Sequence, residues 1–367
     1  MSDETSGPAD GRPAEPERRL PGAHLQPSRD SLEVEQRAET PAGRSRMSDI
    51  LSGSVGHNLG LVVALGLICL VGVFTVGDRF ASIDNTLTIL RAASTIGVVS
   101  IGMTFVIIGG GIDLSVGAIL ALCSVWATTF ATQTMAQDTH WVLMVMVALA
   151  VGAGCGLVNG ILIAYGKVVA FVTTLAMLAS ARGLAEVISE RRTQIVKVQG
   201  FKDFFGAEVL GVSVIIIIFA VVSAIGWVLL NRTTFGRRTL AVGGSPEAAR
   251  LAGINVNRHT VMLYVLVGVC CGIAALMLVS RTTTGSSTHG GLYELEAIAA
   301  VVIGGTLLSG GRGTIVGTIF GVLIFQTLTN VFTLNNQDTS TQAVAKGAII
   351  VVAVMLQQRL ARRSAAT

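Results

Sequence analysis

The sequence predicts an all-α integral membrane protein with about ten transmembrane helices, and its composition indicates this class in two ways. Hydrophobic residues make up 51% of the 367 residues and charged residues only 13%, about half of the roughly 25% typical of soluble domains. Glycine is also abundant, at 43 residues, as it is in membrane-spanning helices. This composition argues against a soluble enzyme, a nucleic-acid-binding protein and a disordered chain.

The first 46 residues differ in composition from the rest. Residues 1–46 contain 7 Lys and Arg, 9 Asp and Glu and six of the seven prolines, without an apolar run. Such a segment cannot bury enough apolar surface to offset the entropy of ordering. We therefore expect a disordered tail over residues 1–46 and a membrane domain over residues 47–367, with Met47-Ser48-Asp49 as a candidate alternative start of the chain.

Ten apolar segments are candidates for membrane spans, which need about 20 residues each. In chain order they are residues 58–77, 88–108, 113–132, 141–165, 169–188, 211–231, 259–280, 295–309, 314–334 and 342–358. Only residues 109–112 (GGGI) separate the second segment from the third, and the eighth is short for a complete crossing. The Lys and Arg residues of the loops favour two cytoplasmic termini, although a basic cluster within residues 189–210 opposes this orientation.

Two of the predicted helices have glycine at every fourth position, which leaves one face without side chains. We expect these faces to pack closely against neighbouring helices of the same subunit, with dimerisation through either face as the alternative. The two sets are Gly152, Gly156 and Gly160, and Gly313, Gly317 and Gly321.

Few ionisable groups fall within the spans. Arg182 and Glu186 are four residues apart and are expected to pair along one helix face. Lys346 lies near the start of the last span, where its long side chain can extend to the membrane surface. Asp113 follows three glycines at a predicted helix start, where capping of free backbone N–H groups is favoured over a proton-carrying role.

The neutral polar side chains within the spans suit an uncharged, hydroxyl-rich solute. They are Asn159, Gln326, Thr329 and Asn330, and hydrogen bonding between helices explains each of them equally well. The spans contain neither a nucleophile with a base nor a cluster of metal ligands. We therefore expect no catalytic residue, no metal site and no cofactor in this chain.

The loop over residues 231–258 has the sequence of a capped helix. Ser245 can cap a helix that begins at Pro246, and Glu247 is favourable in its first turn. Gly253 is placed to end that helix. The pattern predicts one short amphipathic helix, flanked by arginines, that a cytoplasmic partner protein would bind.

Three motifs together resemble the membrane permease subunits of ribose/xylose-type ATP-binding-cassette importers, within the wider branched-chain amino-acid and sugar permease family. They are residues 109–117 (GGGIDLSVG), residues 235–254, which include FGRR and GGSPEAARLAGI, and residues 304–313 (GGTLLSGGRG). With the matching spans, the resemblance covers residues from about 58 to 358, and the first 46 residues have no counterpart in it.

The resemblance implies a type II-like permease of ten spans that works as a pair in the inner membrane of a bacterium. Its implied partners are a second permease copy, membrane lipid, two cytoplasmic ATPase subunits and an extracytoplasmic sugar-binding protein, with no nucleic acid. Because the chain has no phosphate-binding loop of its own, ATP is expected to be bound by a partner, and the chain is not expected to be an enzyme. The resemblance implies that the loop contacts the ATPase through Arg237, Arg238, Gly243, Gly244, Ser245, Pro246, Glu247, Ala248, Ala249, Arg250 and Gly253.

The glycine-rich breaks at residues 109–117 and 304–313 are where we expect the solute path, because irregular backbone at membrane depth is tolerated beside a cavity or within protein. The candidate path residues are Gly110, Gly111, Asp113, Asn159, Gln326 and Asn330. Residues 106–110 also resemble residues 301–305, which indicates either an internal duplication or chance similarity.

A monosaccharide such as ribose or xylose is the expected solute. A branched-chain amino acid is the first alternative, although a zwitterion would favour charged partners along the path. The second alternative is an ion-coupled secondary transporter, which would usually contain a series of buried acidic groups. A membrane-embedded enzyme is the third.

Overall fold

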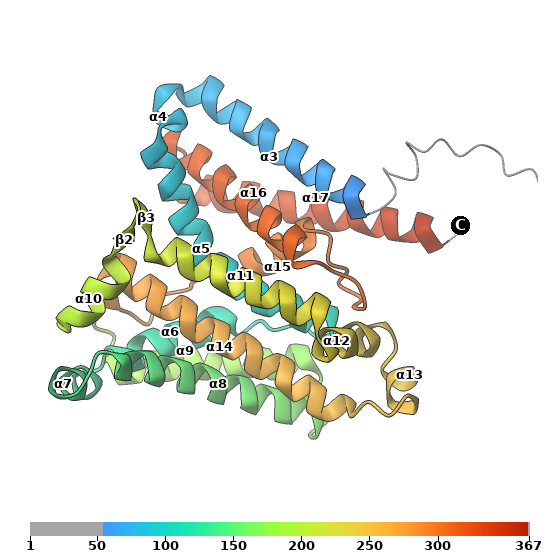
Figure 1. The fold of residues 1–367 in the computed structure, drawn as a ribbon, viewed down its shortest axis with the longest axis horizontal. Helices are drawn as coiled ribbons and strands as arrows, with labels where there is room; N and C mark the ends of the chain where they lie inside the picture. The colour runs from blue at the N-terminus through green and yellow to red at the C-terminus, as the bar shows by residue number, and fades with distance from the viewer. Residues whose placement is uncertain (1–53, 366–367) are drawn as a thin grey trace, which may run out of the picture. The chain divides into compact units, whose positions relative to one another are not determined.

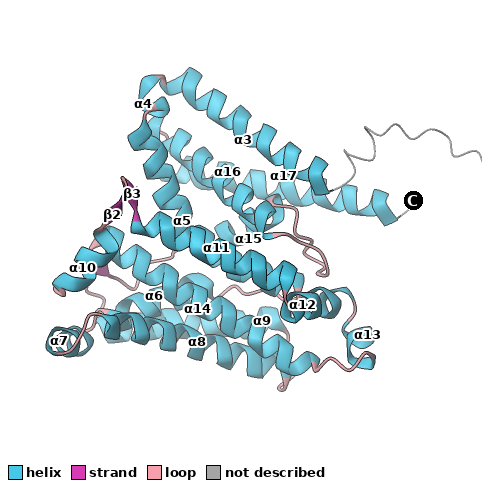
Figure 2. Cartoon of the chain, in the orientation of Figure 1, coloured by secondary structure: helices cyan, strands magenta, loops and turns pink. Residues whose placement is uncertain are grey.

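The computed structural model describes residues 54–365, so the expected tail over residues 1–46 and the candidate start at Met47 lie outside the described residues. The described chain is a bundle of α-helices with two small two-stranded sheets (Figures 1 and 2). Its elements in chain order are α3 (Ser54–Val76), α4 (Asp78–Ala81), α5 (Ile83–Ile108), α6 (Val116–Ala127), α7 (Phe130–Asp138), α8 (Val142–Ala164), α9 (Ala170–Ser189), β1 (Gln194–Ile195), α10 (Gln199–Gly206), β2 (Glu208–Val209), β3 (Val212–Ser213), α11 (Val214–Arg232), α12 (Thr234–Gly244), α13 (Pro246–Leu251), α14 (Val256–Thr282), β4 (Thr284–Gly285), α15 (Tyr293–Ile303), α16 (Ile315–Leu334) and α17 (Thr339–Ala365).

Polar caps set the beginnings of several long helices. The Ser82 hydroxyl accepts the Asn85 N–H before α5, and the Thr314 hydroxyl accepts the Gly317 N–H before α16. The Asn255 side chain does the same for α14. These short polar side chains satisfy N–H groups that have no partner within the helix, so each apolar run begins at a defined residue.

The centre of the bundle is formed by the second half of α5 and by α6. Every residue from Ala93 to Ile108 is buried, and so is every residue of α6 except Trp126. At 1.5 Å per residue α6 is about 18 Å long, well short of a hydrocarbon core of about 30 Å. It is surrounded by α8, α9 and α14, so this short apolar helix is buried in protein instead of facing lipid.

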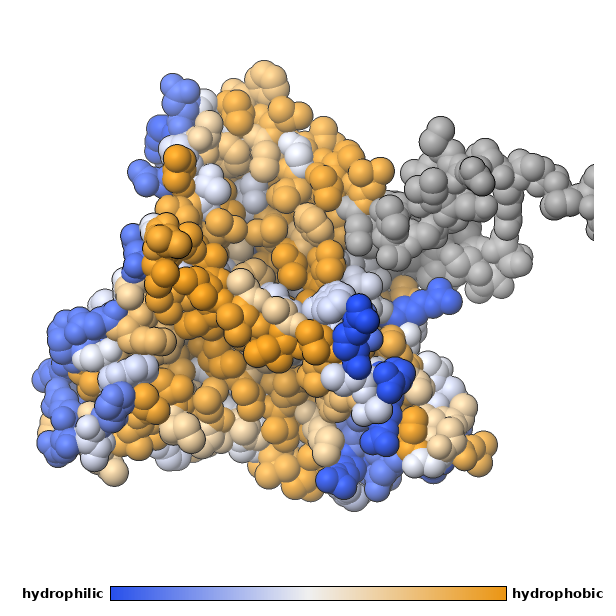
Figure 3. All heavy atoms as spheres, in the orientation of Figure 1, coloured by the Kyte–Doolittle hydropathy of each residue, from blue (hydrophilic) through white to orange (hydrophobic). Residues whose placement is uncertain are grey.

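The outer helices expose apolar side chains, as lipid-facing helices do. Large apolar residues of α3, α8, α9 and α11 are exposed, including Phe74, Met146, Val172 and Ile225. Figure 3 shows apolar residues along the bundle and hydrophilic residues gathered at its two ends. The distribution identifies an integral membrane protein.

Seven helices within residues 54–365 are long and apolar enough to cross a membrane. They are α3, α5, α8, α9, α11, α14 and α16. The third expected span is the pair α6 and α7, bent by 52°, and the short eighth span is the 11-residue α15. The number of complete crossings therefore stays a prediction, whereas a helix is present at each of the ten predicted positions.

The two ends of the bundle have different elements. In Figure 1 the start of α3, the end of α17 and the helices α12 and α13 lie at one end, while α4, α7, α10 and the β2–β3 hairpin lie at the other. At this second end β1 pairs antiparallel with β4, with Gln194 opposite Gly285. The pairing connects the 189–210 segment to the residues that follow α14.

The glycine faces pack within the subunit, as the sequence predicts, but the second face begins at Gly317, because Gly313 precedes α16 and is not helical. A Cβ atom at Gly152 or Gly156 would overlap a backbone carbonyl oxygen of α14, and one at Gly160 would lie 2.7 Å from the Val261 Cα. In the second set, a Cβ at Gly317 or Gly321 would overlap a carbonyl oxygen at the end of α15. Absent side chains therefore permit close backbone contact between α8 and α14, and between α15 and α16.

Replacing Gly156 with Ala should destabilise the bundle, because the new methyl group meets the α14 backbone, which cannot move aside as a side chain can. We expect a loss of about 1–3 kcal/mol, typical of overpacking, measured as a lower midpoint of thermal unfolding in detergent. Gly154→Ala on the same helix is the control, since its Cβ has no neighbour within 4 Å. Equal losses in both variants would contradict the packing argument.

Candidate functional site

The two glycine-rich breaks end their helices with the same hydrogen bonds. After α5, the Gly110 N–H donates to the Ile107 carbonyl and the Gly111 N–H to the Val106 carbonyl, at 2.9 Å each. After α15, the N–H groups of residues 305 and 306 donate to the carbonyls of residues 302 and 301. Gly110 and Gly305 have φ of 82° and 87°, the left-handed conformation that this type of helix end requires. The resemblance between residues 106–110 and 301–305 thus extends to backbone geometry.

Asp113 and Asn159 meet in a buried polar cluster beside the first break. The Asp113 Oδ1 accepts the Ser115 N–H at 2.8 Å and the Ser115 hydroxyl at 2.5 Å. The Asn159 amide donates to the Ser115 hydroxyl oxygen at 3.0 Å, and the Tyr264 hydroxyl donates to the Ile112 carbonyl at 3.0 Å. Asp113 therefore accepts a backbone N–H just before α6, and it links that helix start to α8 on the neighbouring side.

Two oxygen atoms of this cluster accept no hydrogen bond. They are Asp113 Oδ2 and Asn159 Oδ1, each on a fully buried side chain, and no Lys or Arg of the described chain forms an ion pair with Asp113. Burial of a polar atom without a partner is costly. The two oxygen atoms are therefore suited to accept hydrogen bonds from a donor group of a bound molecule, such as a hydroxyl.

The other two polar candidates, Gln326 and Asn330, lie on α16, and the amide nitrogen of each has a partner, while Asn330 Oδ1 is buried without a donor. The Gln326 amide donates to Glu296 at 3.4 Å, and the Asn330 amide donates to the Asn85 side chain at 2.8 Å. The structure thus brings Asp113 and Asn159 together and places Gln326 and Asn330 in contacts between helices. These contacts are of the kind expected from polar residues in membrane helices.

Glu296 and Lys346 form a half-buried ion pair that sequence reasoning missed. The Lys346 ammonium group lies 2.7 Å from Glu296 Oε1 and 5.3 Å from the Phe325 ring centroid. The expectation that Lys346 extends to the membrane surface is therefore wrong, because a carboxylate on α15 pairs with it inside the bundle. No sequence spacing signals this pair, since the two residues are 50 positions apart.

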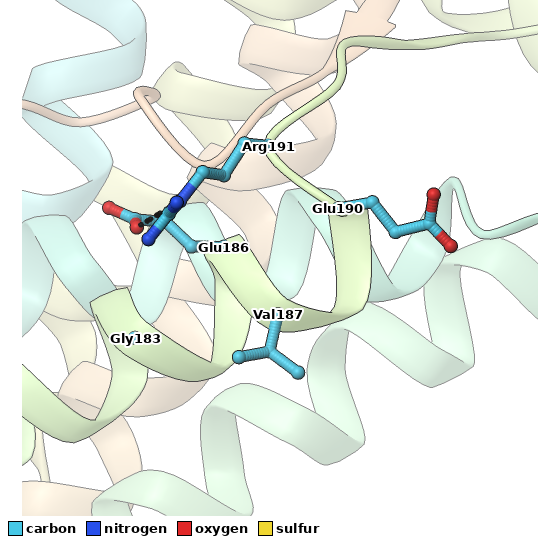
Figure 4. Close-up of a pocket in the computed structure, with 5 residues that line it drawn as sticks. All are labelled: Gly183, Glu186, Val187, Glu190 and Arg191. Carbon is cyan, nitrogen blue, oxygen red and sulfur yellow. Dashed lines mark hydrogen bonds and ion pairs between the residues drawn. The ribbon is translucent and has the colours of Figure 1, made fainter.

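The expected pair between Arg182 and Glu186 is also wrong. The Arg182 guanidinium donates to the carbonyls of Ser287 and His289, and Glu186 pairs with Arg191 at 3.2 Å. Figure 4 shows Glu186 and Arg191 turned toward each other beside a pocket of about 390 Å³, with Glu190 pointing away. Arg182 instead holds the loop between α14 and α15.

The loop at residues 231–258 contains two helices, not the one that the sequence predicts. As predicted, α13 begins at Pro246, and the Ser245 hydroxyl accepts the Ala248 N–H at 3.2 Å. The preceding α12 (Thr234–Gly244), which contains Arg237 and Arg238, was not predicted. Its start is capped by the Thr233 hydroxyl, a signal that was available in the sequence.

The α12 helix is fixed to the bundle, whereas α13 presents side chains outward. The Thr239 hydroxyl lies 2.9 Å from His259 Nε2 of α14, and the Phe235 ring contacts the His259 ring at a centroid distance of 4.8 Å. On α13, Glu247 and Arg250 form an exposed ion pair at 3.0 Å, and Leu251 is 90% exposed. Sequence reasoning missed Leu251, because its position on a helix of six residues does not reveal which face is free.

Comparisons with known proteins match most of the described chain. The family described as "Branched-chain amino acid transport system / permease component" matches residues 85–354. The ribose import permease protein RbsC of Bacillus subtilis is 43% identical over 298 residues, 80% of this chain and 91% of that protein. The fructose import permease protein FrcC of Rhizobium meliloti is 37% identical over 306 residues, 81% of this chain and 84% of that protein.

The L-arabinose ABC transporter permease protein AraH of Azospirillum brasilense is 37% identical over 284 residues, 77% of this chain and 82% of that protein. No solved structure matches the chain.

Replacing Asp113 with Asn should preserve the fold, because the Asn carbonyl oxygen can accept both bonds from Ser115 and its amide can supply a missing donor. Asp113→Ala should lower the free energy of unfolding by about 1–3 kcal/mol, since it leaves buried donors unpaired. Thermal unfolding in detergent compares the two variants with the unmodified protein. A loss as large for Asn as for Ala would show that the cluster needs a charged carboxylate.

Acidification should weaken the loop held by Arg182. Burial, and secondarily the charge of Arg182, lowers the pKa of His289 to about 4, whereas an unfolded His has a pKa of about 6.5. The unfolded chain therefore binds more protons between these values, and stability falls as the pH drops through this window. The midpoint of thermal unfolding should fall more between pH 7.5 and 5.5 in the unmodified protein than in His289→Gln. Identical pH dependences would contradict this assignment.

Proposed function

The chain belongs to the family described as branched-chain amino acid transport system permease components, and from this premise we propose that it is the permease subunit of an ATP-binding-cassette importer for a monosaccharide. The observation that supports a sugar is the identity of 37–43% to permeases named for ribose and fructose import, over about four fifths of the chain. The amino-acid alternative is not favoured by these relatives. The chain itself transports and is not an enzyme.

The proposed assembly contains two permease copies, two cytoplasmic ATPase subunits and an extracytoplasmic sugar-binding protein, in the inner membrane of a bacterium. Each permease has ten spans within residues 47–367, and its termini and the coupling loop at residues 231–258 face the cytoplasm. This orientation is supported by the arginines around α12 and α13 and by the position of α13 at the same end of the bundle as the end of α17 (Figure 1).

The α13 helix is the proposed docking element for the ATPase. Leu251 is an exposed apolar side chain beside the exposed Glu247–Arg250 pair, which suits insertion into an apolar groove with a polar rim. Burial of one leucine contributes about 1.5–3 kcal/mol. Two residues that the sequence assigns to this contact are left out of it, because Ala249 is buried and Gly243 packs against the Ile108 carbonyl. The other assigned residues are exposed on or beside α12 and α13: Arg237, Arg238, Gly244, Ser245, Pro246, Glu247, Ala248, Arg250 and Gly253. Movement of α13 then biases the bundle between its outward-open and inward-open states.

The proposed solute path passes the first break. Asp113 and Asn159 are its favoured contacts, because each has a buried oxygen atom without a donor and a sugar presents hydroxyl donors. Gly110 and Gly111 supply backbone at the same break. Gln326 is less suited, since its amide pairs with Glu296. Asn330 also has a buried oxygen atom without a donor, but its amide pairs with Asn85 at the opposite end of α5 from the break.

Leu251→Asp and Glu247→Arg should abolish co-purification of the ATPase and reduce sugar uptake about tenfold or more, the factor that a loss of about 1.4 kcal/mol produces. Membrane insertion should be unchanged, because both side chains are exposed. The measurement is a mild-detergent pull-down from native membranes, paired with uptake into cells. Leu210→Asp is the matched control, since Leu210 is 99% exposed on the β2–β3 hairpin at the opposite end.

Two results would overturn the proposal. One is recovery of the unmodified chain without any ATPase. The other is uptake that continues without ATP and stops with an uncoupler, which would identify an ion-coupled transporter.

A further inference from the structure

The three glycine-rich motifs meet at one point, although 117 residues separate the first from the second and 49 separate the second from the third. The Gly311 N–H, in the second break, donates to the carbonyl of Ile108, which ends α5 before the first break, at 2.8 Å. The last turn of α12 lies against both. A Cβ at Gly243 would overlap the Ile108 carbonyl oxygen and would lie 2.7 Å from the Gly311 nitrogen.

Gly310 and Gly311 of the second break also lie against backbone at this point. A Cβ at Gly310 would lie 2.9 Å from the Gly243 oxygen and 3.0 Å from the Gly110 Cα. One at Gly311 would lie 2.9 Å from the Gly244 Cα. Real Cβ atoms do not approach backbone this closely, so the contact consists of backbone against backbone. We call Gly110, Gly243, Gly244, Gly310 and Gly311 the glycine junction.

We propose that the glycine junction transmits the movement of α13 to both breaks at once; this inference rests on the proposed function. Only Ser245 separates α12 from α13, so a movement of α13 displaces α12 with it. Side chains can absorb a small displacement by changing rotamer, but a backbone contact has no such freedom. A displacement of α12 therefore moves the backbone of Ile108 and Gly311, because no side chain lies between them that could rearrange.

The junction also connects the ATPase end of the molecule to the buried polar cluster. Gly110 is three residues before Asp113, and the intervening Ile112 carbonyl accepts the Tyr264 hydroxyl. A shift at Gly110 thus reaches Asp113 and, through Ser115, the Asn159 amide. On the other side, Gly311 precedes the start of α16 by four residues. A single displacement of α12 therefore reaches both the polar cluster after the first break and the start of α16 after the second.

The first test replaces Gly243 with Ala in the complete transporter, with permease, ATPase and binding protein reconstituted in vesicles. Alanine is the better helix former, so any loss must come from the contact and not from α12 itself. ATPase co-purification should be retained because α13 is unchanged, ATP hydrolysis should continue, and sugar uptake should fall about tenfold or more. Gly154→Ala, whose Cβ lies in open space, should leave all three unchanged.

A second measurement uses the unmodified transporter, so it tests the role of the glycine junction even if Gly243→Ala fails to assemble. Addition of a non-hydrolysable ATP analogue should change amide hydrogen exchange in residues 106–113 and in residues 304–314 together. Leu251→Asp, which removes docking, should abolish both changes.

The outcomes separate the two proposals. Normal uptake in Gly243→Ala, or an exchange response at only one break or at neither, would overturn the junction while leaving the importer assignment intact. Failure of the unmodified chain to bind any ATPase would overturn the importer assignment and the junction with it.

Discussion

The structure depends on one constraint, that every backbone N–H and C=O group at membrane depth must find a partner within the protein. The chain nevertheless interrupts its helices twice inside the bundle, after α5 and after α15. Helix-end hydrogen bonds close both interruptions, and the bond from Gly311 to Ile108 joins one to the other. The short helix α6 is possible because other helices bury all of its residues except Trp126.

The same constraint explains where the glycines lie. Helices that must approach to backbone distance, such as α8 and α14, present glycine to each other, because lipid and protein are equally apolar and association relies on close packing. The outer helices need no such approach and present large apolar side chains instead. Some polar side chains in the interior are paired across helices, as the Asn330 amide is with Asn85 and Lys346 with Glu296.

Sequence reasoning predicted the features that local patterns determine. It placed a helix at each apolar segment, the Ser245 cap before α13 and the close packing of the Gly152 and Gly317 faces. It failed where a distant partner decides the outcome, since Arg182 binds carbonyls 105 and 107 residues away and Lys346 pairs with a residue 50 positions earlier. It also missed α12, whose glycines and threonines are poor helix formers and whose helical form relies on contacts with α14.

The Glu296–Lys346 pair has a consequence for how the chain enters the membrane during synthesis. The 11-residue α15 is too short to cross a bilayer alone, and it contains an acidic group whose partner is translated 50 residues later. A carboxylate at this depth is costly until it is paired. Glu296 therefore stays without its partner until α17 has been made, so we expect the last three helices, about a fifth of the chain, to reach their final packing together.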